Sequence, residues 1–441
     1  MLTAILRNNL PHWKIKESQT KLKTSLMPKR AFWLGLLLIF PLILSFFCWI
    51  QPASASVIQP EEERIFSQAW RIVSQAYVDD TFNHQNWWLV RQNTLKQKLE
   101  NREETYAAIE NMLSGLGDPF TRLLKPQQYR SLKVNTSGEL SGVGLQIALD
   151  PETGELAVVA PLTGSPAEEA GIQPRDHILE IDGIPTSELT LDEAATHMRG
   201  PVGTKVTLTV QGKDGLAKPI ELVRDRIALN SVYAKLDNQS EDFPIGYIRL
   251  TQFSANSAQE IAHAIAQLEE EGAEGYILDL RNNPGGLLQS GIEIARLWLD
   301  HGTVVYTVNR LGMLGSFEAD GPVLTQDPLV VLVNEGTASA SEILAGALQD
   351  NGRAKLVGQK TFGKGLIQSL FDLSDGSGLA VTVAKYETPS HRDINKLGIE
   401  PDVAVPLESI TLSEVATEAD SQYQAAKKLL TTETVLTANA A

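Results

Sequence analysis

Ser339 stands in a segment whose residue types suit nucleophilic chemistry. Residues 331–342 (VLVNEGTASASE) predict a buried strand, a tight turn of small residues and the start of a helix. A serine at a helix N-terminus lies beside free backbone N–H groups that can stabilise an oxyanion. The alternative is a serine that only caps the helix. No histidine has a comparable motif, so a Ser-His-Asp triad has little local support.

Lys364 is the candidate base for that serine, because a desolvated lysine with a lowered pKa can accept a proton. Residues 361–368 (TFGKGLIQ) place it between two glycines and beside the apolar Phe362 and Leu366. The alternative is an ordinary solvated lysine. A third segment, residues 279–286 (DLRNNPGG), ends a strand with a turn that exposes backbone N–H groups. That turn suits an oxyanion hole, but it also suits a simple chain reversal.

Composition narrows the classes of function. The chain has 441 residues, of which 43% are hydrophobic and 21% charged, and this suits two or three globular domains. The single cysteine, Cys48, excludes a disulfide framework and a cysteine-based zinc site. The seven histidines form no His-Glu-x-x-His pattern, so the sequence does not support a metalloprotease. Nucleophilic chemistry by a serine and a lysine needs no metal or other cofactor, and none is expected. A net charge of −16 argues against nucleic acid as a partner, because phosphate binding requires clustered cations.

Residues 1–55 are interpreted as a targeting segment. Basic residues up to Lys29 and Arg30 precede the apolar run 31–50, and Ala53-Ser54-Ala55 fits a cleavage signal. The alternative is an uncleaved anchor, since about 20 apolar residues can span a bilayer. In either case we expect the remainder of the chain to be exported.

Periodicity and turn residues divide the rest of the chain into four parts. Residues 56–133 have helical spacing of apolar residues and predict a small helical domain. Residues 134–215 predict a compact α/β module of short strands and glycine turns. Residues 216–406 alternate strands with helices, which predicts a layered α/β domain. Residues 407–441, rich in Thr, Ala, Glu and Ser, predict a poorly ordered or loosely docked tail.

Together, the chemical segments resemble those of the carboxyl-terminal processing peptidases, also called tail-specific proteases. The Arg-x-Asn-Pro-Gly-Gly, Thr-Ala-Ser-Ala-Ser-Glu and Gly-Lys-Gly segments occur in the family's order, and Lys364 follows Ser339 at the family's spacing. The resemblance covers residues 60–405. It implies an α+β multidomain protein with an N-terminal helical domain, a PDZ domain and a layered α/β catalytic core of the crotonase or Clp-protease type.

The resemblance also implies roles for the site residues. Ser339 is the nucleophile and neutral Lys364 is its general base. The third member is either Gln368, one helical turn after the lysine and able to orient the amine from i+4, or Glu342, three residues after the serine. Because the base is an unprotonated lysine, activity is expected to rise with pH to an alkaline plateau. The oxyanion hole consists of the backbone N–H groups of Gly285 and Ala340.

The middle module resembles a PDZ domain. Residues 141–145 (SGVGL) are similar to the loop that captures a C-terminal carboxylate on consecutive N–H groups while the peptide adds as a strand. Residues 176–183 (DHILEIDG) resemble the PDZ stretch that leads into a strand turn. Arg199 follows the second helix of the module and is a candidate relay between peptide binding and catalysis. The implied substrate-binding residues are Gly142, Val143, Gly144, Leu145 and Arg199.

Three N-terminal segments narrow the resemblance. Residues 77–83 (YVDDTFN), 105–109 (TYAAI) and 118–122 (DPFTR) are similar to enzymes of oxygenic phototrophs. Those enzymes remove the C-terminal extension from the precursor of a photosystem II reaction-centre subunit in the thylakoid lumen. The implied partners are proteins with accessible C-terminal tails, that precursor first, with peripheral contact to a membrane-bound substrate. The alternative is a periplasmic tail-specific protease of broader specificity.

Two further alternatives come from other functional classes. A PDZ scaffold with a dead catalytic fold would have no need for Ser339, Lys364 and Gln368 together. A crotonase-like acyl-CoA enzyme would share the layered α/β plan, but the export signal and the PDZ module argue against it.

Overall fold

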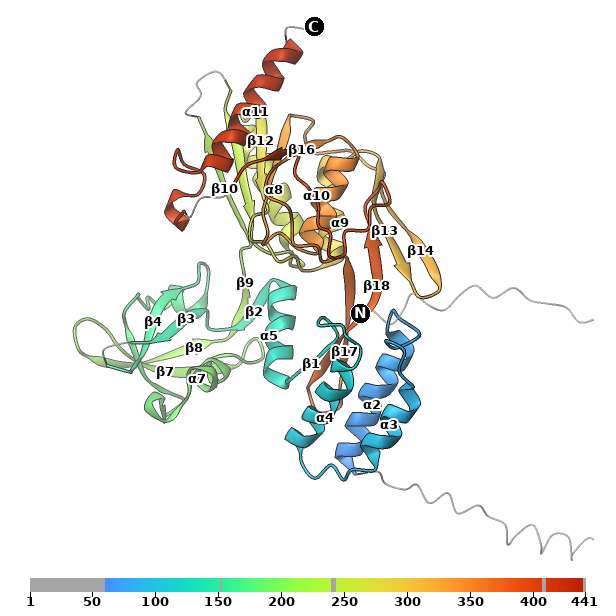
Figure 1. The fold of residues 1–441 in the computed structure, drawn as a ribbon. Coiled ribbons are helices and arrows are strands. Elements are labelled where there is room, and N and C mark those ends of the chain that lie inside the picture. Colours follow the sequence, from blue (N-terminus) through green and yellow to red (C-terminus); the bar gives the residue numbers. More distant parts are fainter. Residues whose placement is uncertain (1–59, 151–152, 239–242, 407–409, 439–441) are drawn as a thin grey trace, which may run out of the picture. The chain divides into compact units, whose positions relative to one another are not determined.

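The structure, a computed structural model, describes residues 60–150, 153–238, 243–406 and 410–438. The predicted targeting segment lies outside these residues. Among the described residues, no helix combines the length and the apolar character that a bilayer crossing requires. The chain is a mixed α/β protein of several domains, which confirms the expected fold class (Figure 1).

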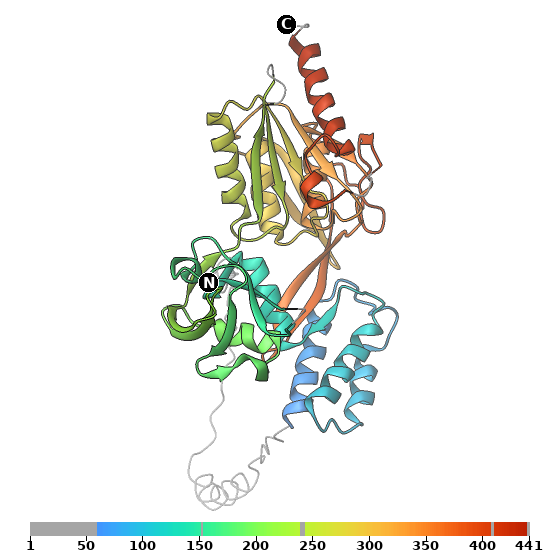
Figure 2. The ribbon, with the colours of Figure 1, turned by 90° about the vertical axis from the view of Figure 1, so that its left-hand side faces the viewer.

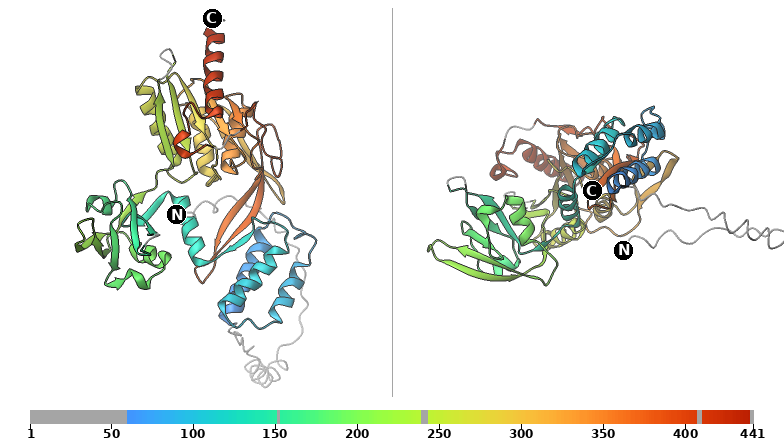
Figure 3. Two further views of the ribbon diagram at one scale, coloured as in Figure 1. Left: turned by 60° about the vertical axis from the view of Figure 1, so that its left-hand side comes forward. Right: turned by 90° about the horizontal axis from the view of Figure 1, so that it is seen from below.

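The N-terminal region is helical. Its helices are α2 (Glu61–Ala76), α3 (Trp87–Leu95) and α4 (Arg102–Ser114). Three glutamates occupy the first turn of α2, where the helix dipole favours them, and the Asn101 side chain caps α4 by accepting from Glu104 N. The helices share an apolar core with the hairpin of β17 (Leu366–Asp372) and β18 (Gly378–Glu387) (Figure 3). Strand β1 (Arg122–Leu124) pairs with β18, so this region is tied directly into the fold that follows it.

The middle module is a small sheet with two short helices. The strands run in the order β3–β4–β5–β7–β8 and surround an apolar core of their own. Their bounds are β3 (Leu145–Leu149), β4 (Leu156–Pro161), β5 (His177–Ile181), β7 (Lys205–Gln211) and β8 (Ala217–Val223). The helices are α6 (Pro166–Glu169) and α7 (Leu191–Met198), and β2 (Glu139–Gly142) pairs separately with β9 (Asp225–Ala228). The module therefore continues past residue 215.

A parallel sheet forms the centre of the layered domain. Its order is β10–β11–β12–β15–β16–β19, with β10 antiparallel and the others parallel. The bounds are β10 (Val232–Asp237), β11 (Ile245–Leu250), β12 (Gly275–Asp279), β15 (Leu329–Val333), β16 (Ala354–Gly358) and β19 (Val403–Ala404). Because parallel strands end at the same edge, the loops after β12 and β15 emerge side by side. These loops carry the Pro-Gly-Gly turn and Ser339.

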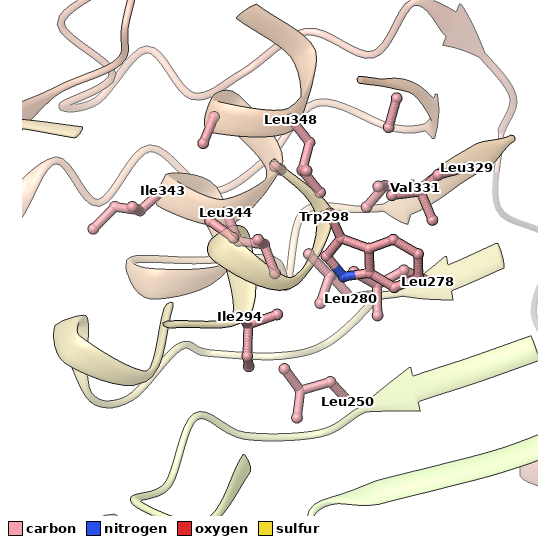
Figure 4. Packing of buried hydrophobic residues seen from close by; sticks show 14 of the residues in the cluster. Leu250, Leu278, Leu280, Ile294, Trp298, Leu329, Val331, Ile343, Leu344 and Leu348 are labelled. Carbon is pink, nitrogen blue, oxygen red and sulfur yellow. The ribbon is translucent and has the colours of Figure 1, made fainter. Parts of the chain in front are cut away.

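Both faces of this sheet are buried, which explains why its strands are almost wholly apolar. Along β15, alternate side chains enter two different cores. Helices α8 (Ser257–Glu270), α9 (Leu288–Trp298) and α10 (Ala340–Asp350) cover one face, where Trp298 packs among leucines (Figure 4). Helix α11 (Ser421–Ala438) covers the other face (Figure 2). A second sheet contains β1, β18, β13 (Gly302–Asn309) and β14 (Gly312–Ala319).

The C-terminal segment corrects one expectation. Residues 407–441 were expected to be poorly ordered or loosely docked, yet Tyr423, Ala426 and Leu430 on α11 are buried in the core beneath the sheet. Asp420 is also fully buried and forms an ion pair with Arg281. The polar composition predicts a loose tail because its apolar residues are few, but these few residues share one face of the helix and are buried together.

Candidate active site

Ser339 lies on the sharp turn between β15 and α10. It occupies the N-cap position of α10, but its backbone has φ 59° and ψ −118°, a conformation that is rare for a residue with a side chain. The turn is fixed to the neighbouring loop, because Ala338 N and Ser341 Oγ both donate to Asn283 O. Ser341 is fully buried in this contact, in keeping with a structural role.

Ser339 opens into a hollow of about 470 Å³. The lining brings together five of the predicted site residues from separate segments of the chain: Ser339, Lys364, Gln368, Gly285 and Ala340. Phe120 and Arg122 of the N-terminal region line it as well. The hollow therefore combines a serine, an amine and the backbone of a glycine turn, which are the groups that acyl transfer requires.

Lys364 lies on the loop between β16 and β17, and its side chain is half-buried. Its Nζ lies over the Phe120 ring, 5.0 Å from the ring centroid. Burial lowers the pKa of the Lys364 amine, and the charge of Arg122 lowers it further, against the opposing effect of Asp118 and Glu342. Among the described residues, no hydrogen bond joins Lys364 Nζ to Ser339 Oγ. In this conformation the amine therefore faces the Phe120 ring.

The buried Tyr386 joins the serine and lysine loops through their backbones. Its hydroxyl contacts the carbonyl oxygens of both Ser339 and Lys364. Burial, and after it the charge of Glu342, raises the Tyr386 pKa well above its usual value, so the hydroxyl stays protonated and can donate.

Glu342 holds the same two loops together but does not contact the lysine amine. Its carboxylate is fully buried. One oxygen accepts from Thr361 Oγ1 at 2.5 Å and Gly363 N at 2.7 Å. The other oxygen accepts from Lys364 N at 2.8 Å and Ser339 N at 2.9 Å. Glu342 thus positions the backbones of the predicted nucleophile and base.

Gln368 does not lie one helical turn after Lys364. It belongs to strand β17, which pairs along its length with β18, so the helical i+4 argument is wrong. The segment is extended because Lys364 lies between glycines in a loop and the following residues form the hairpin. Gln368 nevertheless lines the same hollow as the amine, and its Nε2 donates to Thr382 Oγ1 at 3.3 Å.

The two halves of the predicted oxyanion hole are not equivalent. Ala340 N donates to no group in the described part of the chain. Gly285 N donates to Asn283 Oδ1 at 2.9 Å, so this donor must be released before it can serve an oxyanion. Gly285 has φ 94°, and a Cβ there would lie 2.7 Å from Ala338 O and 2.9 Å from Ala340 N. Only glycine allows the turn to approach the serine loop this closely.

The predicted carboxylate-binding loop links β2 to β3. Gly144 has φ 77°, and the carbonyl oxygens of Val143 and Gly144 accept from Ala167 N and Leu162 N. Strand β3, which begins at Leu145, is at the edge of its sheet and thus has a free side for strand addition.

Arg199 follows α7 and is exposed. A Cβ placed on Gly142 would be 3.4 Å from the Arg199 Cα, so this arginine adjoins the predicted binding loop. Ser141 Oγ donates to Gly200 O at 2.6 Å and fixes the two segments to each other.

Sequence reasoning missed the residues around the lysine. Asp118, Phe120, Arg122, Thr382 and Tyr386 carry no local signal of a site. Residues 118–122 resemble enzymes of oxygenic phototrophs, but the segment alone indicates no chemical role. The signal that would have found them is the pairing of β1 with β18, in which Arg122 lies opposite Ala380. That pairing is long-range and cannot be read from either segment alone.

Comparison with known proteins gives consistent matches. Residues 244–405 match Peptidase family S41, and residues 158–212 match the PDZ domain family. The chain is 60% identical to a carboxyl-terminal-processing protease of Synechocystis sp., covering 91% of this chain and 94% of that protein. It is 45% identical to the chloroplastic carboxyl-terminal-processing peptidase 2 of Arabidopsis thaliana, covering 78% and 69%. A solved structure of a photosystem II D1 C-terminal processing protease superposes with a TM-score of 0.53 at 39% identity, covering 82% and 98%.

Proposed function

Because the chain belongs to the S41 family of carboxyl-terminal-processing serine proteases, we propose that Ser339 is its nucleophile and Lys364 its general base. The observation that carries this assignment is the shared hollow, in which Ser339 and Lys364 meet the backbone of Gly285 and Ala340. Burial lowers the lysine pKa and so favours the neutral amine that a general base requires. Membership of a peptidase family also argues against the acyl-CoA alternative.

The reaction begins when the Lys364 side chain turns from the Phe120 ring toward Ser339. Nζ takes the Oγ proton while Oγ forms a bond to the scissile carbonyl carbon. The N–H groups of Ala340 and Gly285 hold the resulting oxyanion, once Gly285 N is released from Asn283 Oδ1. The ammonium then returns its proton to the leaving amine as the C–N bond breaks. Water, deprotonated by the same amine, hydrolyses the acyl-enzyme.

The middle module supplies recognition of the substrate tail. In this proposal, the N–H groups of Val143, Gly144 and Leu145 bind the terminal carboxylate, and the tail pairs with the edge of β3. Arg199 adjoins the loop at Gly142 and is exposed to an incoming peptide. Its role in relaying tail binding to catalysis belongs to the same proposal. Loss of Arg199 should then weaken tail preference or turnover.

The proposed substrate is the photosystem II reaction-centre precursor, processed in the thylakoid lumen after export. The 39% identity to a photosystem II D1 C-terminal processing protease supports this choice, as do the cyanobacterial and chloroplastic relatives. The second candidate is a periplasmic tail-specific protease of broad specificity. Export fits both, because each substrate lies outside the cytoplasm.

Cleavage of the precursor's C-terminal extension by the full chain tests both parts of the proposal. Ser339→Ala and Lys364→Ala are expected to abolish cleavage. Lys360→Ala is the matched control, because Lys360 lies in the same loop but is exposed and paired with Glu400. Cleavage of unrelated unfolded tails, but not of the precursor, would favour the periplasmic role. Full activity of Lys364→Ala would refute the assignment of the base.

A further inference from the structure

A chain of side-chain hydrogen bonds runs from the N-terminal region to Gln368. Asp118 Oδ2 accepts from Thr382 Oγ1 at 2.7 Å and from Thr121 Oγ1 at 2.7 Å. Thr382, on β18, is fully buried, and its Oγ1 also accepts from Gln368 Nε2 at 3.3 Å. The chain therefore ends on the wall of the hollow that contains Lys364.

Donor and acceptor counting fixes the direction of every bond in this chain. An ionised carboxylate can only accept, so the single Thr382 hydroxyl proton must point to Asp118. Thr382 Oγ1 then has only lone pairs left for Gln368, so Gln368 must donate to it from its NH₂ group. The reversed amide would place two acceptor oxygens against each other. Gln368 Oε1 is consequently the end of the amide left for another donor.

We propose that Asp118 and Thr382 are positioning residues that fix the amide of Gln368, so that its Oε1 accepts a hydrogen bond from Lys364 Nζ when the lysine turns toward Ser339. This inference rests on the proposed role of Lys364 as base. The lysine amine donates hydrogen bonds through its N–H groups. If the Gln368 amide were reversed, its NH₂ group would face the amine, and two donors would oppose each other. With one N–H held by Gln368, the lone pair of the neutral amine is directed to a defined place.

An amide carbonyl suits this task better than a carboxylate. A carboxylate in direct contact with Nζ would stabilise the ammonium form and oppose deprotonation at neutral pH. Gln368 brings a neutral acceptor to the amine, while the charge of Asp118 is separated from it by Thr382. The charged groups that do act on the amine are Arg122, Asp118 and Glu342.

The N-terminal segment is held firmly enough to act in this way. Thr382 N donates to Thr121 Oγ1 at 3.0 Å, and Phe120 N donates to Asp118 Oδ1 at 2.9 Å. Both bonds lie next to the β1–β18 pairing. The N-terminal region therefore contributes to the base itself, in addition to covering the hairpin.

The test compares Thr382→Val with Thr382→Ser in the full chain, using a peptide that carries a cleavable C-terminal tail. Valine keeps the shape but removes the hydroxyl, so kcat should fall by about tenfold or more with KM little changed. Serine keeps the hydroxyl and should restore most of kcat. Thermal unfolding of both variants checks that the fold survives. Since Thr382 acts through Gln368, the double variant Thr382→Val/Gln368→Ala should be no slower than Gln368→Ala alone.

Several outcomes would overturn the inference. These are a stable Thr382→Val enzyme with the original kcat, a serine variant as slow as the valine variant, or losses that multiply in the double variant. Failure of the proposed function gives a different pattern, in which Lys364→Ala itself retains activity. Lys364→Ala inactive with Thr382→Val fully active would remove only the inference drawn here.

Discussion

Replacement of Glu342 by glutamine tests whether this residue acts as a clamp between the serine and lysine loops. Each carboxylate oxygen accepts two hydrogen bonds, and three of the four donors are backbone N–H groups. Glu342→Gln keeps the size of the side chain but converts one acceptor into a donor. Whichever way the new amide is turned, its NH₂ group faces at least one N–H that can only donate.

The magnitude follows from the best orientation available to the amide. Turned toward Thr361 and Gly363, the NH₂ can still donate to the Thr361 hydroxyl, but Gly363 N loses its acceptor. An unsatisfied buried N–H costs about 1–3 kcal/mol. The bonds from Ser339 N and Lys364 N persist as neutral ones, each about half as strong as a charge-assisted bond. The free energy of unfolding should therefore fall by about 3 kcal/mol. A displacement of about 1 Å between the loops lowers kcat by about 100-fold.

The assay is kcat on a tail peptide together with thermal unfolding, with Glu335→Gln as the matched control. Glu335 is exposed in the same β15–α10 connection, so its neutralisation should change neither quantity. If Glu342→Gln kept the original stability and lost only activity, a direct chemical role would be favoured over a clamp. If it kept both, the reasoning from the four hydrogen bonds would be refuted.

Three other substitutions test the charge, the turn and the C-terminal segment. Burial and then the charge of Arg122 lower the pKa of Lys364, so Arg122→Gln should raise that pKa and move the rise of kcat/KM to higher pH. Arg122→Lys keeps the charge and should leave the profile in place. A pH profile of Arg122→Gln that is unchanged between pH 5 and 10 would contradict this reasoning. Gly285→Ala should lower kcat by about 100-fold or more, because the added methyl group would displace the Pro-Gly-Gly turn from the serine loop. An unchanged kcat would show that the turn can move without affecting catalysis. Asp420→Asn should lower the free energy of unfolding by about 2 kcal/mol, because Arg281 loses one ion pair but keeps the one with Asp279. Urea unfolding measures this change. An unchanged midpoint would argue against tight docking of the C-terminal segment.

The central sheet and its chemical loops could be predicted because their signals are local. Strand β15 is a continuous apolar run, and after Asn334 and Glu335 the residues up to Ser341 are all small. The same holds for β12 and the Pro-Gly-Gly turn. Parallel strands end at one edge, so two separate local motifs are enough to predict one site.

The remainder of the site depends on pairings that no local pattern reveals. Asp118 and Thr382 are 264 positions apart, and Arg281 and Asp420 are 139 apart. Gln368 follows Lys364 by four positions, a spacing that fits a helix, and the helical prediction is wrong because the segment pairs with β18 as a strand. Long-range partners also explain why the C-terminal helix was underestimated.

These contacts explain how the Lys364 amine can have a lowered pKa beside two carboxylates. Glu342 has all four of its hydrogen bonds with donors other than the amine. Asp118 is likewise engaged by Thr121, Thr382 and Phe120 N. Within the described chain, Lys364 Nζ forms no ion pair, so neither acid stabilises the ammonium form by direct contact. Burial and Arg122 then prevail, and the pKa of the amine is lowered rather than raised. If Lys364 is the general base proposed above, the hydrogen bonds that occupy the two nearby acids are as necessary to its lowered pKa as the burial of the amine.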